Sequence, residues 1–207
     1  MDRFVISIGR QLGSGGREIG KKLAAEFGIR FLDSELITLA AKESGFGAEF
    51  FRDTDEKKGF FNTLFNRIQS GVSFGGYYDN QLSEEALFKI QSDAIRKIAD
   101  EESCVIVGRC ADYILRDMKN VVNIFITADL DWRAKQVMKR HQCDMQEALR
   151  IIHNAEDTRS SYYNYYTGKR WGEAASYDLC VNSSLLGLDA TEQFIAEFIR
   201  KRLKMKD

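Results

Sequence analysis

A glycine-rich stretch near the N-terminus has the composition of a site that binds phosphate. Residues 9–20 read GRQLGSGGREIG and stand between the apolar run FVISI and the helical pattern KKLAAEFG. In a turn between a strand and a helix, glycines let backbone N–H groups approach an anion closely at the positive end of the helix. A tight strand-to-helix turn without a ligand is the alternative interpretation.

The spacing of this stretch differs from the usual phosphate-binding loop, GxxxxGK followed by Ser or Thr, whose lysine neutralises the terminal phosphate. If Gly15 takes the second glycine position, Arg10 takes the first. Gly16 then stands at the lysine position and Arg17 at the Ser/Thr position. In the first helical turn, the guanidinium of Arg17 would offer an anion a fork of donors. The loop by itself therefore suits either phosphate binding or a tight turn.

Polar side chains also follow two other short apolar runs. Arg109 comes directly after CVIVG, Asp112 lies in the helix expected next, and Asp33 follows the apolar pair FL. The carboxyl ends of parallel strands share one edge of a sheet, where open α/β sheets bind ligands. An arginine at that edge is costly unless it meets an anion or pairs with a structural carboxylate, and both interpretations are open for Arg109. Asp33 can bind a ligand, cap the following helix, or do both.

A helix near the C-terminal third is expected to carry polar side chains on one face. This helix begins with Asp144 and Glu147 in capping-box spacing and ends at Gly168. The helical segment before it, DLDWRAKQVMKRH, contains Arg133 and Arg140 on one face. Within the helix that begins at Asp144, one face carries residues at the spacing i, i+3, i+4 and i+7, namely Arg159, Tyr162, Tyr163 and Tyr166. We interpret it as a polar face that closes over a substrate, and a tyrosine-rich packing seam is the alternative.

The elements that must position these residues alternate between short β-rich runs and amphipathic helical patterns. This alternation predicts a parallel sheet whose strands are buried on both faces and covered by helices. One helix is expected to begin at Ser83, and another at Asp189 with Glu192 three residues later and an apolar stripe at 194, 195, 198 and 199. The expected strands are Phe4–Ile8, Ile29–Leu32, Cys104–Val107, Val122–Ile126 and Asp178–Val181.

Composition limits the classes of protein to which the chain can belong. Its 207 residues, 44% apolar and 29% charged, suit a single globular domain. The net charge of −1 argues against a nucleic-acid partner. No apolar run of about 18 residues and no signal-like leader occurs, so we expect a cytoplasmic protein without a membrane partner. The four cysteines and two histidines lack the spacing of a metal site, and buried free thiols are expected.

An aromatic-rich segment, residues 45–80, interrupts the alternation of strands and helices. It contains seven phenylalanines and two tyrosines, together with the charged stretch RDTDEKKG and the glycine-bearing stretch SGVSFGG. Three interpretations are open: a helical flap packed on the core, a mobile segment that closes over the acceptor side of a substrate site, and the surface of a homodimer.

Several of these motifs together resemble the cytidylate kinase-like family of P-loop nucleoside monophosphate kinases, in order and over most of the chain. ISIGRQLGSGGREIGKKLA is similar to the phosphate loop of the subgroup in which GSGGR replaces GSGKG. FLDSELI resembles the family's segment after the second strand, and VIVGRCAD its Gly-Arg strand end. VNIFITADLDWRAK resembles the fourth strand and the helix into the lid, and DTRSSYYNYYTGKRWGEAASYDLCVNSS the lid and last strand.

The resemblance implies a P-loop kinase-like three-layer α/β fold, a single domain over residues 1–207 with a five-stranded parallel sheet and a helical lid over 141–172. It implies ATP and Mg²⁺, small-molecule nucleotide substrates, and phosphoryl transfer to a nucleoside monophosphate, with the conversion of CMP to CDP as the first candidate. It also implies that Gly13, Ser14, Gly15, Gly16 and Arg17 bind the ATP phosphates. Catalytic roles fall on Arg17, Arg133 and Arg159, acceptor binding on Asp33, Arg109, Asp112 and Tyr163, and a place near the adenine on Asn182. No metal ligand is assigned to the protein.

The type of acceptor decides whether the site needs a general base. A phosphate monoester has a second pKa of about 6 and is largely ionised at neutral pH, so a nucleoside monophosphate can attack unaided. A kinase of a small metabolite with a hydroxyl group would need a base, for which Asp33 is the candidate. The absent loop lysine also suits a third function, a nucleotide-binding or sensing protein without turnover.

Overall fold

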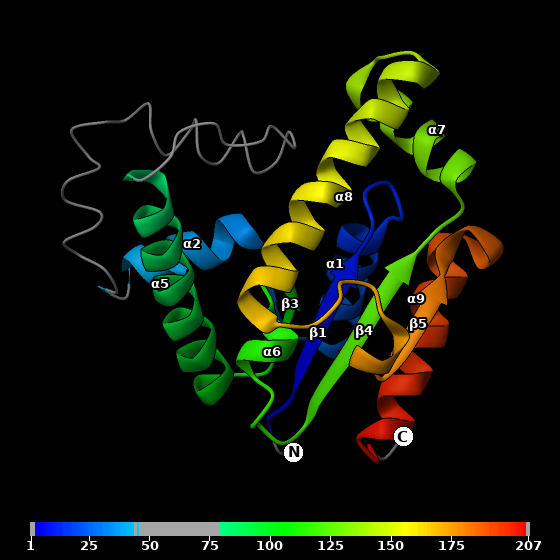
Figure 1. Ribbon diagram of the computed structural model, residues 1–207. Coiled ribbons are helices and arrows are strands. Elements are labelled where there is room, and N and C mark those ends of the chain that lie inside the picture. Colours follow the sequence, from blue (N-terminus) through cyan, green and yellow to red (C-terminus); the bar gives the residue numbers. More distant parts are fainter. Residues whose placement is uncertain (1–2, 44, 46–78, 206–207) are drawn as a thin grey trace.

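A five-stranded parallel sheet forms the centre of the molecule (Figure 1). The computed structural model describes residues 3–43, 45 and 79–205. The strand order is β2-β3-β1-β4-β5, and all neighbouring strands are parallel, as the sequence predicted. The strands are β1 (Val5–Arg10), β2 (Arg30–Leu32), β3 (Cys104–Val107), β4 (Val121–Thr127) and β5 (Leu179–Asn182), which confirms each expected strand with small shifts at its ends.

Helices connect the strands and cover both faces of the sheet (Figure 1). Several ends follow from local sequence: Gly28 and Gly168 adopt left-handed conformations that end α1 and α8. The Asp144 carboxylate accepts a hydrogen bond from Glu147 N at 2.8 Å, which confirms the predicted cap. The helices are α1 (Gly16–Phe27), α2 (Ser34–Glu43), α5 (Asp79–Glu101), α6 (Ala111–Ile114), α7 (Leu130–His141), α8 (Met145–Thr167) and α9 (Ser183–Arg202).

The core consists of two apolar layers, one on each face of the sheet. Successive strand residues point to opposite faces, so Ile6 and Ile8 of β1 are buried with residues of α1 and α9, whereas Val5 is buried with residues of α2, α5, α6 and α8. All three are fully buried. Burial on both faces explains why the strand sequences are continuous apolar runs rather than alternating ones.

Helix starts were predicted less accurately than strands. Helix α5 begins at Asp79, so Ser83 lies inside it and is not its N-cap. Helix α9 begins at Ser183 after the N-cap Asn182, and the backbone breaks at Gly187, where φ is 76°. Asp189 follows this break, and for this reason its sequence resembles the start of a helix. The predicted stripe on α9 was wrong at one position, since Phe194 is 48% exposed.

Two further expectations concern the aromatic segment and the cysteines. The aromatic segment 45–80 falls almost entirely outside the described residues, so its three interpretations stay predictions. Within the described part, Cys104 and Cys110 are buried free thiols, whereas Cys180 is exposed, because β5 is an edge strand. None of the helices described here is long and apolar enough to cross a membrane.

A pair of carboxyl groups at the contact between α1 and α9 makes the stability depend on pH. Glu192 is 8% exposed, and burial together with the neighbouring Glu26 raises its pKa from an ordinary 4.5 to about 7. The hydrogen bond from Glu192 lowers the pKa of Glu26. The folded chain therefore retains a proton on Glu192 that the unfolded chain releases at lower pH.

We expect the free energy of unfolding to fall as the pH rises from 5 to 8, because only the folded state still binds this proton. Glu192→Gln keeps a hydrogen-bond donor without the charge, and its stabilising effect should be larger at pH 8 than at pH 5 by on the order of 1 to 2 kcal/mol. Urea unfolding at both pH values measures this difference. The exposed Glu173→Gln is the control, and an equal effect of Glu192→Gln at both pH values would contradict the prediction.

Candidate active site

The loop between β1 and α1 is fixed by hydrogen bonds to neighbouring elements. Gln11 N donates to Ile126 O at 3.1 Å and continues the contact between β1 and β4. The buried hydroxyl of Ser183, at the start of α9, lies 2.6 Å from Ser14 O and 3.1 Å from Thr127 O as a shared donor. The hydroxyl of Ser14 donates to Gln11 O at 2.9 Å, so this predicted phosphate-binding residue supports the loop from within.

Two loop glycines are required by backbone conformation and by close packing. Gly13 and Gly15 have φ values of 82° and 75°, in the left-handed region that favours glycine. A Cβ atom on Gly13 would lie 2.6 Å from the carbonyl oxygen of Arg133 in α7. The loop therefore packs directly against the first turn of α7, and no side chain fits between them.

The backbone amides of this loop are free to bind an anion. In the part of the chain that the structure describes, the N–H groups of Gly13, Gly15, Gly16 and Arg17 have no hydrogen-bond acceptor. A helix N-terminus also carries roughly half a positive charge. Unpaired amides at such an end are a phosphate-binding arrangement, so the geometry fits the predicted site.

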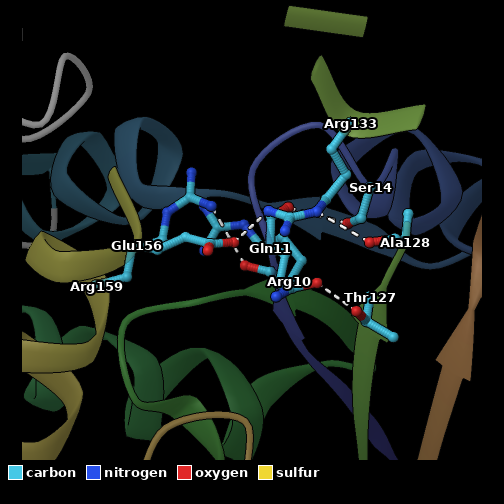
Figure 2. Close-up of polar contacts among 8 residues, drawn as sticks. All are labelled: Arg10, Gln11, Ser14, Thr127, Ala128, Arg133, Glu156 and Arg159. Atoms are coloured by element: carbon cyan, nitrogen blue, oxygen red, sulfur yellow. Dashed lines mark hydrogen bonds and ion pairs between the residues drawn. The ribbon is translucent and has the colours of Figure 1, made fainter. Parts of the chain in front are cut away.

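Three guanidinium groups lie near this loop without an ion pair to any described carboxylate: those of Arg10, Arg109 and Arg159. They come from the end of β1, the turn after β3 and helix α8, and Figure 2 shows Arg10 and Arg159 side by side. Arg159 Nη1 donates to Arg10 O at 3.3 Å, and the guanidinium of Arg109 lies 5.4 Å from the ring centre of Tyr162. Positive charge is thus concentrated here, although the nearby carboxylates of Asp33 and Glu156 offset part of it.

Burial and mutual repulsion make this arrangement costly. Burial lowers the pKa of Arg10 well below its ordinary value, and the charges of Arg159 and Arg109 lower it further. Burial likewise lowers the pKa of Arg159 to about 10. A multivalent anion would offset both effects, because it supplies negative charge and hydrogen-bond acceptors together.

The backbone that positions Arg109 is strained. Gly108, Arg109 and Cys110 have φ values of 83°, 55° and 54°, so two non-glycine residues occupy the left-handed region. Each such residue costs of order 1 to 3 kcal/mol, and strain of this kind concentrates at functional sites. The turn places Arg109 at the carboxyl end of β3, on the same edge of the sheet as the loop.

Two predicted site residues, Arg17 and Asp33, are paired with each other. Arg17 donates from Nε and Nη2 to Asp33 Oδ2 at 2.9 and 2.6 Å. Asp33 Oδ1 accepts hydrogen bonds from Glu35 N and Leu36 N, so Asp33 also caps α2. The predicted helix cap is thereby confirmed, whereas binding of a ligand by Asp33 stays a prediction.

Arg133, a predicted catalytic residue, is largely committed to protein contacts. Its Nε donates to Ala128 O at 2.9 Å, and its Nη1 donates to Glu156 Oε1 at 2.5 Å (Figure 2). The side chain is 8% exposed. This ion pair ties α7 to α8 beside a small apolar cluster of Ala134, Val137, Ala148 and Ile152. In this arrangement Arg133 holds the two helices together next to the loop.

The predicted acceptor residues Asp112 and Tyr163 lie together in the core. The Tyr163 hydroxyl donates to Asp112 Oδ2 at 2.6 Å, and burial raises the pKa of this carboxyl group. Tyr166 stacks on Phe88 of α5 with ring centres 3.9 Å apart. For these tyrosines the contacts match the packing-seam interpretation, whereas Arg159 on the same helix reaches the loop.

Asn182 lies at the opposite side of the loop from α8, where β5 ends. Its Nδ2 donates to Asp129 Oδ1 at 2.9 Å, and its Oδ1 accepts from Ser184 N at 3.0 Å. Asp129 and Ser184 in turn line a hollow of about 460 Å³ at the start of α7, together with Leu130, Asp131, Trp132 and Lys135. Asn182, the residue expected near the adenine, therefore contacts two of the residues that line this hollow.

The side chains of the described site do not form a metal cage. No group of three or more His, Cys, Asp or Glu residues lies together in residues 3–43, 45 and 79–205. Asp33 is already held by Arg17, and the Ser14 hydroxyl faces the loop interior. The site offers an anion guanidinium groups and amides, and offers a divalent cation few ligands of its own.

Three residues of the site were missed or undervalued in the sequence. Arg10 was recognised only as the residue at the first glycine position, although an arginine at that position is itself a signal. The family resemblance placed the segment around Asn182 and Ser183 near the adenine. Nothing in the sequence indicated the loop contact of Ser183 or the ion pair of Glu156, because their partners Ser14 and Arg133 are distant in sequence.

Comparison with known proteins relates the whole chain to one family. Residues 5–185 match the model of the cytidylate kinase-like family. The chain is 24% identical to the cytidylate kinase of Methanopyrus kandleri, over 98% of this chain and 96% of that protein. It is 28% identical to the cytidylate kinase of Pyrococcus horikoshii, over 88% of this chain and 81% of that protein.

Solved structures share the same fold. The crystal structure of an uncharacterized protein from Eubacterium ventriosum is 29% identical, with a TM-score of 0.73, over 95% of this chain and 98% of that chain. Shikimate kinase from Bacteroides thetaiotaomicron is 13% identical, with a TM-score of 0.54, over 98% and 99% of the two chains, a likeness of fold alone. The predicted P-loop kinase-like α/β fold is thereby confirmed.

The anchoring of the loop by Ser183 can be tested by substitution. Ser183→Ala removes the buried donor shared by Ser14 O and Thr127 O, and we expect it to lower the free energy of unfolding by about 1 to 3 kcal/mol. Urea unfolding measures the loss. Ser160→Ala, whose hydroxyl bond to Asp157 O is exposed, should change stability far less, and equal losses in the two variants would argue against a special role for Ser183.

Proposed function

Because the chain belongs to the cytidylate kinase-like family, we propose that it transfers the terminal phosphoryl group of ATP to a nucleoside monophosphate, with CMP as the first acceptor to test. The observation that carries this proposal is the set of guanidinium groups of Arg10, Arg109 and Arg159, none of them ion-paired to a described carboxylate, beside a glycine loop whose amides have no acceptor among the described residues. The names of the archaeal relatives support CMP over other acceptors.

The proposed reaction needs positioning and charge neutralisation more than proton transfer. The triphosphate would lie on the loop amides, with Arg10 and Arg159 next to it, and the acceptor phosphate would meet Arg109 at the end of β3. An ionised phosphate of the acceptor attacks the terminal phosphorus of ATP, and the bond to the bridging oxygen breaks. Guanidinium groups fixed in advance stabilise the charge that spreads over the transferring group.

In this proposal Mg²⁺ enters the site together with ATP, as the cation bound to its phosphates. When bound, it would neutralise the phosphate charge, and it usually keeps several waters and takes ligands from substrate phosphates. The protein groups carry the remaining roles, and Asn182 with the neighbouring hollow would receive the adenine.

The contacts of Asp33 disfavour a metabolite kinase that relies on this residue as its base. One carboxylate oxygen is held by Arg17, and the other accepts two amides of α2. These contacts occupy both carboxylate oxygens and leave Asp33 no free position toward a hydroxyl group. A nucleotide-binding protein without turnover has no support from these contacts and is an outcome of the assay below.

The proposal predicts turnover that depends on Arg159. With ATP and Mg²⁺, the purified protein should phosphorylate at least one of CMP, dCMP, UMP, AMP and GMP, and Arg159→Met should lower kcat by at least about 100-fold. The same substitution should not lower the melting temperature, because the charge that it removes is buried and is repelled by Arg109 and Arg140. The exposed Arg116→Met is the matched control. Binding of ATP without turnover of any acceptor would instead indicate the sensing function.

A second prediction separates a phosphate acceptor from a hydroxyl acceptor. If the acceptor attacks through an ionised phosphate, Asp33→Asn should leave kcat within about tenfold of the wild type, whereas loss of a general base costs about 100- to 10,000-fold. Asparagine still caps α2, so the fold should be retained. Steady-state kinetics with saturating acceptor measures kcat, and a fall of more than about 100-fold in the folded variant would support the hydroxyl acceptor.

A further inference from the structure

The side chain of Arg10 follows a path that two glycines keep open. It leaves the end of β1, passes Gly16 in the first turn of α1 and reaches Gly108 after β3. A Cβ atom on Gly16 would lie 2.7 Å from Arg10 Cβ and 3.1 Å from Arg10 Cγ. A Cβ atom on Gly108 would lie 2.5 Å from Arg10 Nη1. The guanidinium of Arg10 is therefore fixed at the carboxyl ends of β1 and β3.

Position 16 requires glycine because the Arg10 side chain leaves no room for a Cβ atom, and not because of its backbone conformation. The left-handed loop glycines are Gly13 and Gly15, whereas Gly16 begins α1 with an ordinary backbone conformation. The nearest atoms to an added Cβ are those of the Arg10 side chain, followed by Ile126 Cβ at 3.6 Å. A side chain at position 16 and the arginine at position 10 therefore exclude each other.

These two positions are the ones at which the loop departs from the pattern GxxxxGK. The pattern has glycine at the first position and lysine at the seventh, whereas this chain has Arg10 at the first and Gly16 at the seventh. We propose that the two positions are exchanged, and that Arg10 supplies from β1 the cation that grips the terminal phosphates of a triphosphate. This inference rests on the proposed function, since it assigns the residue that binds its triphosphate substrate.

Arg17 is less suited to this task, although it follows the loop directly in sequence. Its Nε and Nη2 both donate to Asp33, and its side chain is 53% exposed. Arg10 has no carboxylate partner among the described residues, and its nearest charged neighbours include Arg109 and Arg159, which repel it. A bound polyphosphate would give Arg10 a negatively charged partner, whereas Arg17 already has one in Asp33.

The first experiment measures binding without turnover. Calorimetric titration with inorganic tripolyphosphate should give an affinity that Arg10→Met lowers by about 10- to 100-fold, since it removes a charge-assisted contact. Arg10→Lys, which keeps the charge, should lose less. Arg30→Met, an arginine of β2 paired with Glu102 at the surface, is the matched control and should bind like the wild type. Unchanged affinity in Arg10→Met, or no binding by the wild type, would overturn the inference.

The second experiment restores the usual pattern. Arg10→Gly should lose the cation, and Gly16→Lys should place its side chain against Arg10, so each single variant should bind tripolyphosphate at least about tenfold more weakly than the wild type. The double variant reads GQLGSGKR over residues 10–17 and should bind at least about tenfold more tightly than either single variant. A double variant that folds, by circular dichroism, and binds no better than the single variants would overturn the exchange.

These experiments distinguish the inference from the function on which it rests. If Arg10→Met loses tripolyphosphate binding while the wild type phosphorylates none of the nucleoside monophosphates, the Arg10 assignment stands and the proposed acceptor class fails. If the wild type turns over a nucleotide and Arg10→Met retains both binding and kcat, the proposed function stands and the Arg10 assignment fails.

Discussion

The repulsion among neighbouring guanidinium groups is the interaction on which the organisation of the site depends. Arg10, Arg109 and Arg159 come from three separate elements and are held together without a described carboxylate between them. Such an arrangement loses stability in the absence of a ligand, and the fold sustains it with buried central strands and a strained turn after β3. In the proposed function, the same arrangement would offer a polyphosphate charges that are already in place.

The other two arginines of the site have different partners and therefore different tasks. Arg17 is tied to Asp33, which also caps α2, so this ion pair links the first turn of α1 to the second helix. Arg133 is tied to Glu156 and to Ala128 O, so it joins α7, α8 and the end of β4. In both cases an arginine that the sequence suggested as a ligand contact joins separate elements of the protein around the loop. The division between open and paired arginines is a property of the tertiary structure.

Helices α7 and α8 form a unit that projects beyond the sheet edge at which the loop lies (Figure 1). Their small apolar cluster, Ala134, Val137, Ala148 and Ile152, is separate from the two core layers. Arg159 of α8 nevertheless reaches Arg10 O, and the carbonyl of Arg133 in α7 packs against Gly13. A movement of this pair of helices would therefore change the contacts of the loop directly, which is what closure over a substrate requires.

The sequence by itself determined the strands, the parallel sheet, the glycine loop and the cap of α8, because apolar runs, glycine positions and capping residues are local signals. It also identified most arginines of the site, but it could not say which were open. That was decided by partners far away in the chain: Asp33 for Arg17, Glu156 for Arg133, and none described for Arg10. The side-chain clash that couples Arg10 to Gly16 likewise exists only in three dimensions, because it depends on how closely the end of β1 approaches the first turn of α1.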